Sequence, residues 1–279
     1  MLPIMQSSLK LLKTAPPTAF LGLTILTVVL FAGVFAPWIA PYGETDVVGA
    51  PGLSIGGDFL FGTDQIGRDV FTRILYGARN TVGIALLVTA MAFFIGVVFG
   101  LISAVSSRWV DQVLSRLVDI LMAIPPLILA LLILTIAGTS VLNMVLVIAV
   151  LDSTRVFRLT RAVGMNVAVL EFVELARLRG EGTWWIVRHE ILPNITAPLA
   201  AEFGLRFCFV FLFISALSFL GLGIQPPTAD WGSMVRETST LISFGIATPL
   251  VPAICIALLT VGVNLIVDWF LYQSGMRKE

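Results

Sequence analysis

Charged residues are scarce in this chain of 279 residues: they make up 12% of it, against 58% for apolar residues, and the mean hydropathy is +1.00. A soluble globular domain carries about 25% charged residues, because it needs a wetted surface. The scarcity excludes a soluble globule, and the length allows several membrane spans of about 20 residues each. The 17 basic and 17 acidic residues cancel, so no bulk charge favours a nucleic-acid partner.

Histidine and cysteine are nearly absent as well. The one histidine, His189, excludes a metal site built from several histidines of this chain. The two cysteines, Cys208 and Cys255, stand in apolar stretches without a C-x-x-C spacing, as small buried hydrophobic residues do. We therefore predict neither a metal site nor a disulfide.

Long apolar runs are what the sequence does contain. They predict six membrane-spanning helices, at residues 19–40, 81–105, 117–137, 141–151, 197–222 and 246–271. The first run exceeds the 7–15 residues or so of a signal-peptide core, so we expect an uncleaved helix. The fourth run is short, because Asp152 and Arg155 follow at once. It must continue through residues 156–159 or tilt, with Arg155 and Arg158 reaching toward the headgroups.

Basic residues are distributed unevenly around these runs. With six spans and a cytoplasmic N-terminus, the inner side holds twelve of them: Lys10, Lys13, Arg108, Arg116, Arg155, Arg158, Arg161, Arg177, Arg179, Arg188, Arg277 and Lys278. The outer side holds four: Arg68, Arg73, Arg79 and Arg236. This is the bias of the positive-inside rule, whereas five spans would place the richest basic loop outside. We predict an all-α polytopic membrane protein with six spans and both termini in the cytoplasm.

Two parts follow from this layout. Residues 1–58 hold the first span and the start of a long outer loop, and residues 59–279 form a five-helix core. The core contains a long cytoplasmic loop, residues 152–196. Long loops without a purpose are uncommon, so we expect the function to lie there.

Within that loop, residues 171–179 are good helix formers. Their apolar members recur at helical spacing: Phe172, Leu175 and Leu178. Gly180 then breaks the helix, and Thr183 is a suitable N-cap for a second helix that Pro193 ends. We predict two short helices joined by a glycine elbow on the cytoplasmic face.

This loop resembles the coupling motif of bacterial binding-protein-dependent ABC importer permeases. The family form is Glu-Ala-Ala, a glycine four residues after the second alanine, and an Ile-x-x-Pro-like ending. Here Glu174, Leu175 and Ala176 form the triplet, and Leu175 departs from the family's alanine. The resemblance implies that the loop docks on an ATP-hydrolysing subunit through Glu174, Leu175, Ala176, Arg177, Gly180 and Pro193. Without the resemblance, an ordinary amphipathic surface helix explains the pattern equally well.

Further stretches resemble the dipeptide, oligopeptide and nickel branch of this family. They are Phe-Gly-Thr-Asp-Gln-Ile-Gly-Arg-Asp at residues 61–69 and Ser-Phe-Leu-Gly-Leu-Gly at residues 218–223, with Trp231 shortly after. The long outer loop after the first span is similar to that of the C-type subunit. The resemblance implies that Asp64, Arg68 and Trp231 lie in outer loops facing a solute-binding protein. The C-terminus departs from the family's usual Asp-Pro-Arg tail.

The resemblance implies a type I ABC importer permease fold and a multi-pass subunit of the bacterial inner membrane. Its implied partners are a sister permease, two cytoplasmic ATPase subunits that use ATP and Mg, an extracytoplasmic solute-binding protein and membrane lipid. The subunit itself is then non-catalytic and binds no cofactor. Residues 62–67 have the glycine spacing of a phosphate loop, but Arg68 and Asp69 stand where Lys and Ser/Thr are required.

Peptides are the expected substrate, while nickel and other small solutes stay open. A self-contained secondary carrier is the competing class. It would need charged sites near the middle of the membrane and often an inverted repeat, whereas the charges here lie near span ends and no repeat is visible. An intramembrane enzyme would need a motif such as H-E-x-x-H, which the sequence lacks.

Charges inside the predicted spans are candidates for function by default. Asp119 and Asp268 lie near the inner ends of the third and sixth spans, where we expect them to be wet or paired. Glu202 and Arg206 stand four apart and can pair on one helix face. None of these predicts the substrate pathway, which stays unknown.

Two local patterns predict how the spans pack and bend. Gly96 and Gly100 form a G-x-x-x-G motif in the second span, whose default meaning is close helix packing. Pro125 and Pro126 should kink the third span.

Overall fold

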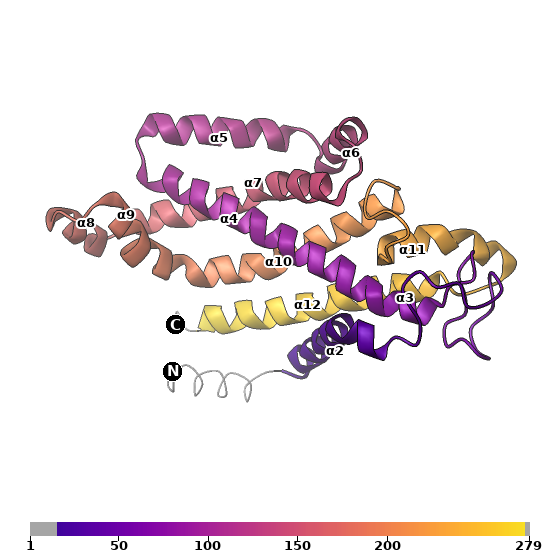
Figure 1. Cartoon of the computed structure of the whole chain (residues 1–279). Coiled ribbons are helices and arrows are strands. Elements are labelled where there is room, and N and C mark those ends of the chain that lie inside the picture. The colour runs from indigo at the N-terminus through magenta and orange to yellow at the C-terminus, as the bar shows by residue number, and fades with distance from the viewer. Residues whose placement is uncertain (1–15, 277–279) are drawn as a thin grey trace. The chain divides into compact units, whose positions relative to one another are not determined.

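The computed structural model describes residues 16–276, which form helices joined by loops (Figure 1). In chain order the helices are α2 (Pro17–Ile39), α3 (Val70–Gly77), η1 (Ala78–Val82), α4 (Gly83–Val105), α5 (Arg108–Ala123), α6 (Pro126–Ala137), α7 (Val141–Ala168), α8 (Glu171–Leu178), α9 (Thr183–Ile186), η2 (Val187–Ile191), α10 (Leu192–Phe219), α11 (Trp231–Thr238), η3 (Ser239–Phe244) and α12 (Leu250–Met276). Within the described range β-pairing is limited to three isolated bridges in the loop before α3. The all-α fold class is confirmed.

Four helical stretches are long and apolar enough to cross a membrane: Pro17–Ile39, Val70–Val105, Thr183–Phe219 and Leu250–Gln273. They confirm the first, second, fifth and sixth apolar runs as helices. The count becomes five if α5 and α6 form one bent span. The arrangement of six spans with both termini inside stays a prediction. Four of the basic residues on which it rests lie outside the described residues: Lys10, Lys13, Arg277 and Lys278.

The third run is not the single kinked helix that the sequence predicts. α5 and α6 meet at 86°. Ile124, the residue before Pro125, is extended, with φ −98° and ψ 133°. A residue before proline avoids the helical region, and proline lacks the N–H that a continuing helix would use. The two prolines therefore end one helix and begin another.

The fourth run continues, as its length required. α7 has 28 residues, which corresponds to about 42 Å at 1.5 Å per residue, enough to cross a bilayer core. Its second half occupies residues 152–168, which the sequence analysis assigned to the cytoplasmic loop. The helix therefore continues past the predicted start of the loop, and the connection between the long helices begins at Val169.

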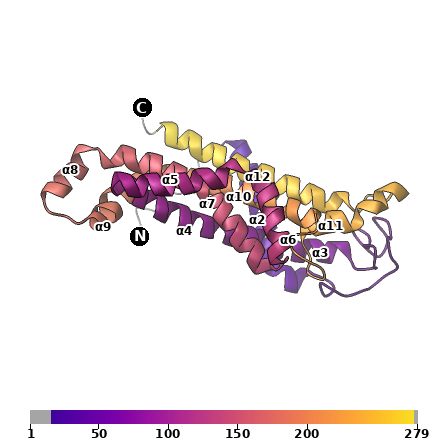
Figure 2. The same ribbon diagram turned by 90° about the horizontal axis from the view of Figure 1, so that it is seen from above.

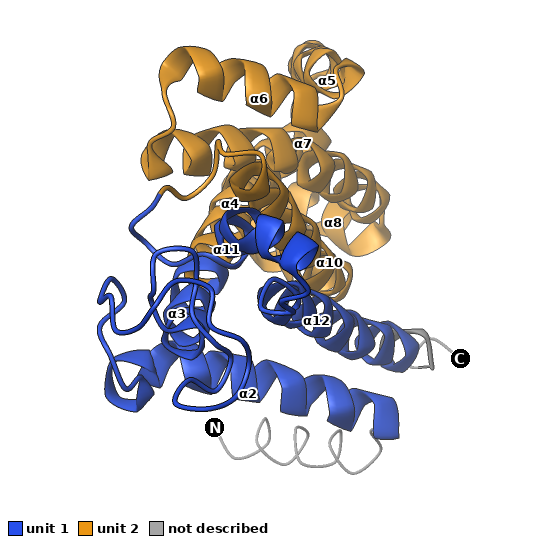
Figure 3. Ribbon diagram, turned by 90° about the vertical axis from the view of Figure 1, so that its right-hand side faces the viewer, with its two compact units in different colours: residues 1–82, 226–279 blue, residues 83–225 orange. Residues whose placement is uncertain are grey.

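The helices form two compact units (Figure 3). Unit 1 comprises the described parts of residues 1–82 and 226–279, and unit 2 comprises residues 83–225. The sequence-based division at residues 58 and 59 rests on different signals and stays a prediction. In unit 1, α2 packs against α12. A Cβ built on Gly22 would lie 2.5 Å from the carbonyl oxygen of Gly262, so glycine permits this approach.

In unit 2, α4 packs along α7 through small residues. A Cβ on Gly96 would lie 2.5 Å from Val156 Cβ and 2.7 Å from the Ser153 carbonyl oxygen. A Cβ on Gly100 would lie 2.7 Å from Thr160 Cβ. The predicted close packing at this G-x-x-x-G motif is confirmed.

Candidate functional site

The glycine elbow lies between α8 and α9, at one end of unit 2 (Figures 1 and 2). Gly180 has φ +83°, the left-handed conformation that glycine adopts without strain. Its N–H donates to the Arg177 carbonyl at 2.9 Å, and the Glu181 N–H donates to the Ala176 carbonyl at 3.2 Å. These two bonds are the Schellman motif, which satisfies the last carbonyls of α8. The predicted elbow is present, although its second helix is capped by Gly182 instead of Thr183.

One face of α8 is anchored in the core of unit 2. Val173 and Ala176 are fully buried. They belong to an apolar cluster with Ile186, Val187 and Ile191 from the helical segment after the elbow. Leu101 of α4 and Ile195 and Leu199 of α10 complete that cluster. The elbow is therefore held by its own chain on both sides of Gly180.

The other face of α8 is exposed, and it carries the apolar residues that the sequence pattern picked out. Phe172, Leu175 and Leu178 are 36%, 58% and 79% exposed. Glu174 and Arg177 are exposed beside them. An exposed stripe of large apolar side chains on an anchored helix marks an interaction surface. Of the residues implied by the family motif, Ala176 is the one that packs inward.

Pro193 does not end the second helix, contrary to the sequence prediction. The chain is helical from Thr183 to Phe219, through α9, the π-helical turn η2 and α10. In η2 the hydrogen bonds skip one more residue, so that the Leu192 N–H reaches the Val187 carbonyl. Pro193 stands in the first turn after this change of pattern, where its missing N–H is tolerated. The elbow thus leads directly into α10.

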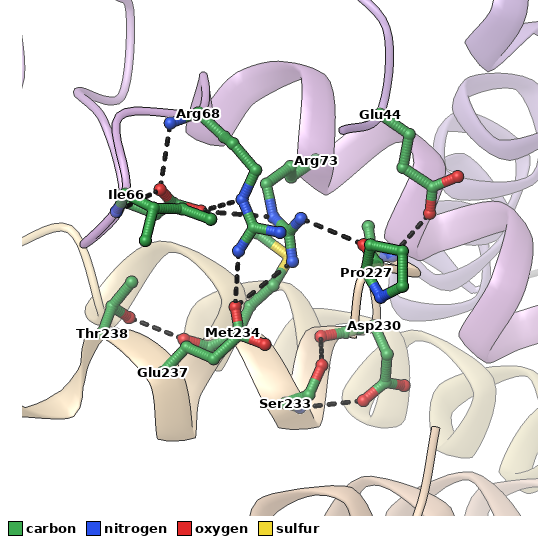
Figure 4. A network of polar contacts seen from close by, with 12 residues as sticks. Glu44, Ile66, Arg68, Arg73, Pro227, Asp230, Ser233, Met234, Glu237 and Thr238 are labelled. Carbon is green, nitrogen blue, oxygen red and sulfur yellow. Dashed lines mark hydrogen bonds and ion pairs between the residues drawn. The ribbon is translucent and has the colours of Figure 1, made fainter. Parts of the chain in front are cut away.

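A second candidate site is a buried ion network in unit 1 (Figure 4). Asp64 Oδ2 lies 2.6 Å from Arg68 Nε and 3.7 Å from Arg73 Nε. Glu237 Oε2, on α11, lies 2.9 Å from Arg68 and 3.3 Å from Arg73. Asp64 Oδ1 also accepts the backbone N–H groups of Ile66 and Arg68. Two guanidinium groups and two carboxylates therefore neutralise each other in a buried place.

Trp231 connects α11 to α3. Its indole Nε1–H donates to the Ile74 carbonyl at 3.0 Å, and a Cβ on Gly77 would lie 2.6 Å from its ring. Thr81 donates its hydroxyl to Asp230, the N-cap of α11, at 2.8 Å. The loop before α3, α3 itself and α11 therefore form one hydrogen-bonded assembly.

The residues predicted to face a solute-binding protein are inside that assembly. Asp64, Arg68 and Trp231 are 2%, 6% and 1% exposed. Their side chains present no surface in this structure, because each is committed to a partner within unit 1. They hold the loop before α3 against α11, and a solute-binding protein facing these loops stays a prediction.

A third group of charges lies in the middle of two long helices of unit 2. Arg206 Nε is 2.7 Å from Glu202 Oε1, so the predicted pair on α10 is confirmed. Arg206 also lies 3.4 Å from Asp152 on α7 and over the ring of Phe209, at 4.6 Å. Asp152 and Arg206 are each more than ten residues from either end of their helices. The expectation that charges lie near span ends concerns their depth in the membrane and stays a prediction.

The remaining arginines of α7 also have partners within unit 2. Arg158 pairs with Asp119 at 2.7 Å, as expected for a wet or paired Asp119. Arg161 pairs with Asp111 of α5, and the Arg155 guanidinium lies 5.6 Å from the Phe209 ring centroid. The prediction that Arg155 and Arg158 reach toward the headgroups concerns their position in the membrane and stays a prediction.

Sequence reasoning missed three residues of these sites. Arg73 and Glu237 are 164 residues apart, so no local spacing reveals their contact. Asp152 was taken as the end of an apolar run. The one available signal was that the apolar run of residues 141–151 is too short to cross a membrane, so a spanning helix there must include Asp152.

Residues 96–277 match the family model of the binding-protein-dependent transport system inner membrane component. The Di/tripeptide transport system permease protein DppC of Pseudomonas aeruginosa is 35% identical, over 88% of this chain and 84% of that protein. The Dipeptide transport system permease protein DppC of Alkalihalophilus pseudofirmus is 36% identical, over 90% of this chain and 83% of that protein. The one of Escherichia coli K12 is 35% identical, over 90% of this chain and 86% of that protein.

A solved structure, the crystal structure of an amino acid ABC transporter with histidines, has the same fold. Its TM-score is 0.53 at 18% sequence identity, covering 70% of this chain and 90% of that chain.

Proposed function

Because the chain belongs to the family of binding-protein-dependent transport system inner membrane components, we propose that it forms one half of a peptide-import pore. It is a permease component of an ABC importer of the bacterial inner membrane. The proposal adds the substrate, di- or oligopeptides, and a sister permease as the other half. It also places ATP hydrolysis, with its Mg, on two separate cytoplasmic subunits. Nickel or another small solute is the alternative cargo.

The observation that carries the coupling role is the two-faced α8. Its inner face, Val173 and Ala176, is buried in the core of unit 2. Its outer face offers Leu175 and Leu178 to a partner. A docked ATPase would therefore bind a helix that cannot shift without moving the apolar core of unit 2, against which it packs. Glu174 and Arg177 are placed to pair with charges at the edge of that contact.

The route into the membrane is the continuous helix that follows the elbow. Thr183–Phe219 has 37 residues, about 55 Å at 1.5 Å per residue. It begins directly after Gly182 and contains Arg206 near its middle. Movement of the elbow would be passed along this helix to the charged group in the middle of unit 2.

We propose a different role for the loop before α3, which we predict to lie on the outer side of the membrane. The ion network of Asp64, Arg68, Arg73 and Glu237 fixes the outer loop against α11. We propose that these loops bind the solute-binding protein. Asp64, Arg68 and Trp231 would then act indirectly, by fixing the conformation of the loops. No nucleotide role is proposed for residues 62–67, because Arg68 and Asp69, which follow, are engaged in this network and in the cap of α3.

Co-purification from the native membrane tests the proposal. We expect the affinity-tagged chain to bring with it a sister permease and two copies or types of ATPase subunit. Cells lacking the chain should lose ATP-dependent uptake of labelled L-alanyl-L-alanine and regain it when the chain is restored. A chain that purifies alone, with uptake driven by an ion gradient, would instead identify a secondary carrier.

A further inference from the structure

A cavity of about 210 Å³ lies within unit 2, between α6, α7 and α10. Two charged residues, Asp152 and Arg155, line it together with apolar side chains. We propose that this cavity binds a short peptide as a zwitterion, with the ammonium group on Asp152 and the carboxylate on Arg155. The inference rests on the proposed peptide import and adds the residues that would recognise the peptide inside the membrane.

Asp152 has acceptor capacity that its own chain does not use. Its side chain is 9% exposed. Oδ2 is buried and has no hydrogen-bond partner among the described residues, and Oδ1 has only a long contact of 3.4 Å with Arg206. Arg206 is held more closely by Glu202, at 2.7 Å. A buried carboxylate is costly unless a cation or donor meets it, so Asp152 calls for a positively charged ligand group.

Arg155 supplies the opposite charge one helical turn further along α7. It lines the same cavity and lies over the Phe209 ring. Among the described residues no ion pair joins its guanidinium group to a carboxylate, and its charge acts on Asp152 only at longer range. A guanidinium group binds a carboxylate with two parallel hydrogen bonds. A lone cation would satisfy only Asp152 and a lone anion only Arg155, whereas a zwitterion satisfies both.

The rest of the cavity wall fits apolar side chains. Leu127 and Ile148 line it from α6 and α7, and Phe209 and Phe213 line it from α10. Its volume equals that of about seven waters at roughly 30 Å³ each, which suits a ligand of one or two small residues. A metal ion is a poor occupant, because no group of three metal-ligand residues occurs in the described part of the chain.

Equilibrium binding to the intact permease–ATPase complex in lipid nanodiscs, without the solute-binding protein, tests the site. The probes are L-alanyl-L-alanine, its N-acetyl derivative and its C-terminal amide. Each derivative lacks one terminal charge, and charged hydrogen bonds are strong enough that we expect binding to weaken about tenfold or more. This comparison needs no variant and cannot be confused with misfolding. Equal binding of the three probes, or no saturable binding of the unmodified dipeptide, would overturn the site.

Two variants assign the ends of the peptide. With Asp152→Asn, acetylation should no longer weaken binding, while amidation still should. With Arg155→Gln the pattern should reverse. Asp119→Asn, an exposed pair member on α5, is the control and should bind all three probes as the wild type does. Both pocket variants keeping the wild-type pattern would contradict the assignment.

A failure of the cavity site can be distinguished from a failure of the proposed import function. ATP hydrolysis by the wild-type complex, stimulated by the solute-binding protein, reports assembly and coupling without any change to the cavity. Stimulated hydrolysis together with peptide binding that depends on both terminal charges supports both proposals. Stimulation and peptide uptake without any peptide binding to the nanodisc complex would remove the cavity site alone.

Discussion

Single side chains decide how the loop before α3 is held in unit 1. Glu237 Oε2 is shared by Arg68 and Arg73, and Asp64 meets the same two guanidinium groups. Arg73 is 1% exposed and Arg68 is 6% exposed, so neither charge can be hydrated if its partner is lost. Breaking a buried pair is costly because it leaves a charge uncompensated.

Replacing Glu237 tests this arrangement. Glu237→Gln keeps the shape and removes the charge that both arginines share, so we expect the free energy of unfolding to fall by about 3–5 kcal/mol. The loss should be local as well, with faster protease cleavage in the loop of residues 41–69. Asp58→Asn is the control, since Asp58 is an exposed acid of that same loop. Equal stability of the two variants would show that the network does not hold the loop.

Residue contacts were predictable only when they were local in the chain. Glu202 and Arg206 were found because a spacing of four places both on one helix face. Asp152 reaches the same arginine from 54 residues away, and only the packing of α7 against α10 brings it there. Its role therefore could not be predicted from spacing.

At the scale of elements, local chemistry predicted the elbow well and the helix ends less well. Gly180 follows a helix-forming segment, and its left-handed conformation is the one that such a glycine implies. The prediction that the helix ends at Pro193 was wrong, because a π-helical turn before this residue lets the helix continue. Such a turn has no clear sequence signal. A kink was expected at Pro125, but the helix axes of α5 and α6 meet at 86°. The break is this sharp because a second proline follows directly.

The elbow can be tested with one substitution at two glycines. A Cβ on Gly180 or Gly182 would have no atom within 4 Å, so neither site is crowded. Gly180 has φ +83°, and a side chain there costs about 1–2 kcal/mol. Gly182 has φ −72° at an N-cap, where serine is favoured.

We therefore expect Gly180→Ser to lower dipeptide uptake several-fold at normal membrane insertion, while Gly182→Ser transports as the wild type does. Uptake and insertion are measured in the same cells by labelled L-alanyl-L-alanine and by immunoblotting of the membrane fraction. Unchanged uptake by Gly180→Ser would show that the left-handed elbow is not needed for coupling.

For the whole molecule, composition established the membrane and the motifs indicated the family. The relatives extend over 88% and 90% of the chain, so the assignment does not rest on the coupling loop alone. The sidedness of the loops rests on basic-residue placement, and α7 is too rich in charge to be recognised as a span by hydropathy. Its 28-residue length is a property of the structure that its apolar run of residues 141–151 did not reveal.

The central claim is that the exposed face of α8 receives the ATPase, and site-directed crosslinking tests it most directly. Leu178 and Phe244 are 79% and 78% exposed, so a cysteine at either position is equally accessible to a benzophenone maleimide. Cys208 and Cys255 are first replaced by serine so that only the chosen site reacts. In the native membrane complex, illumination of Leu178→Cys should yield a covalent adduct with an ATPase subunit, and Phe244→Cys, on the predicted outer side, should not. No ATPase adduct at Leu178→Cys, or equal adducts at both positions, would contradict the account.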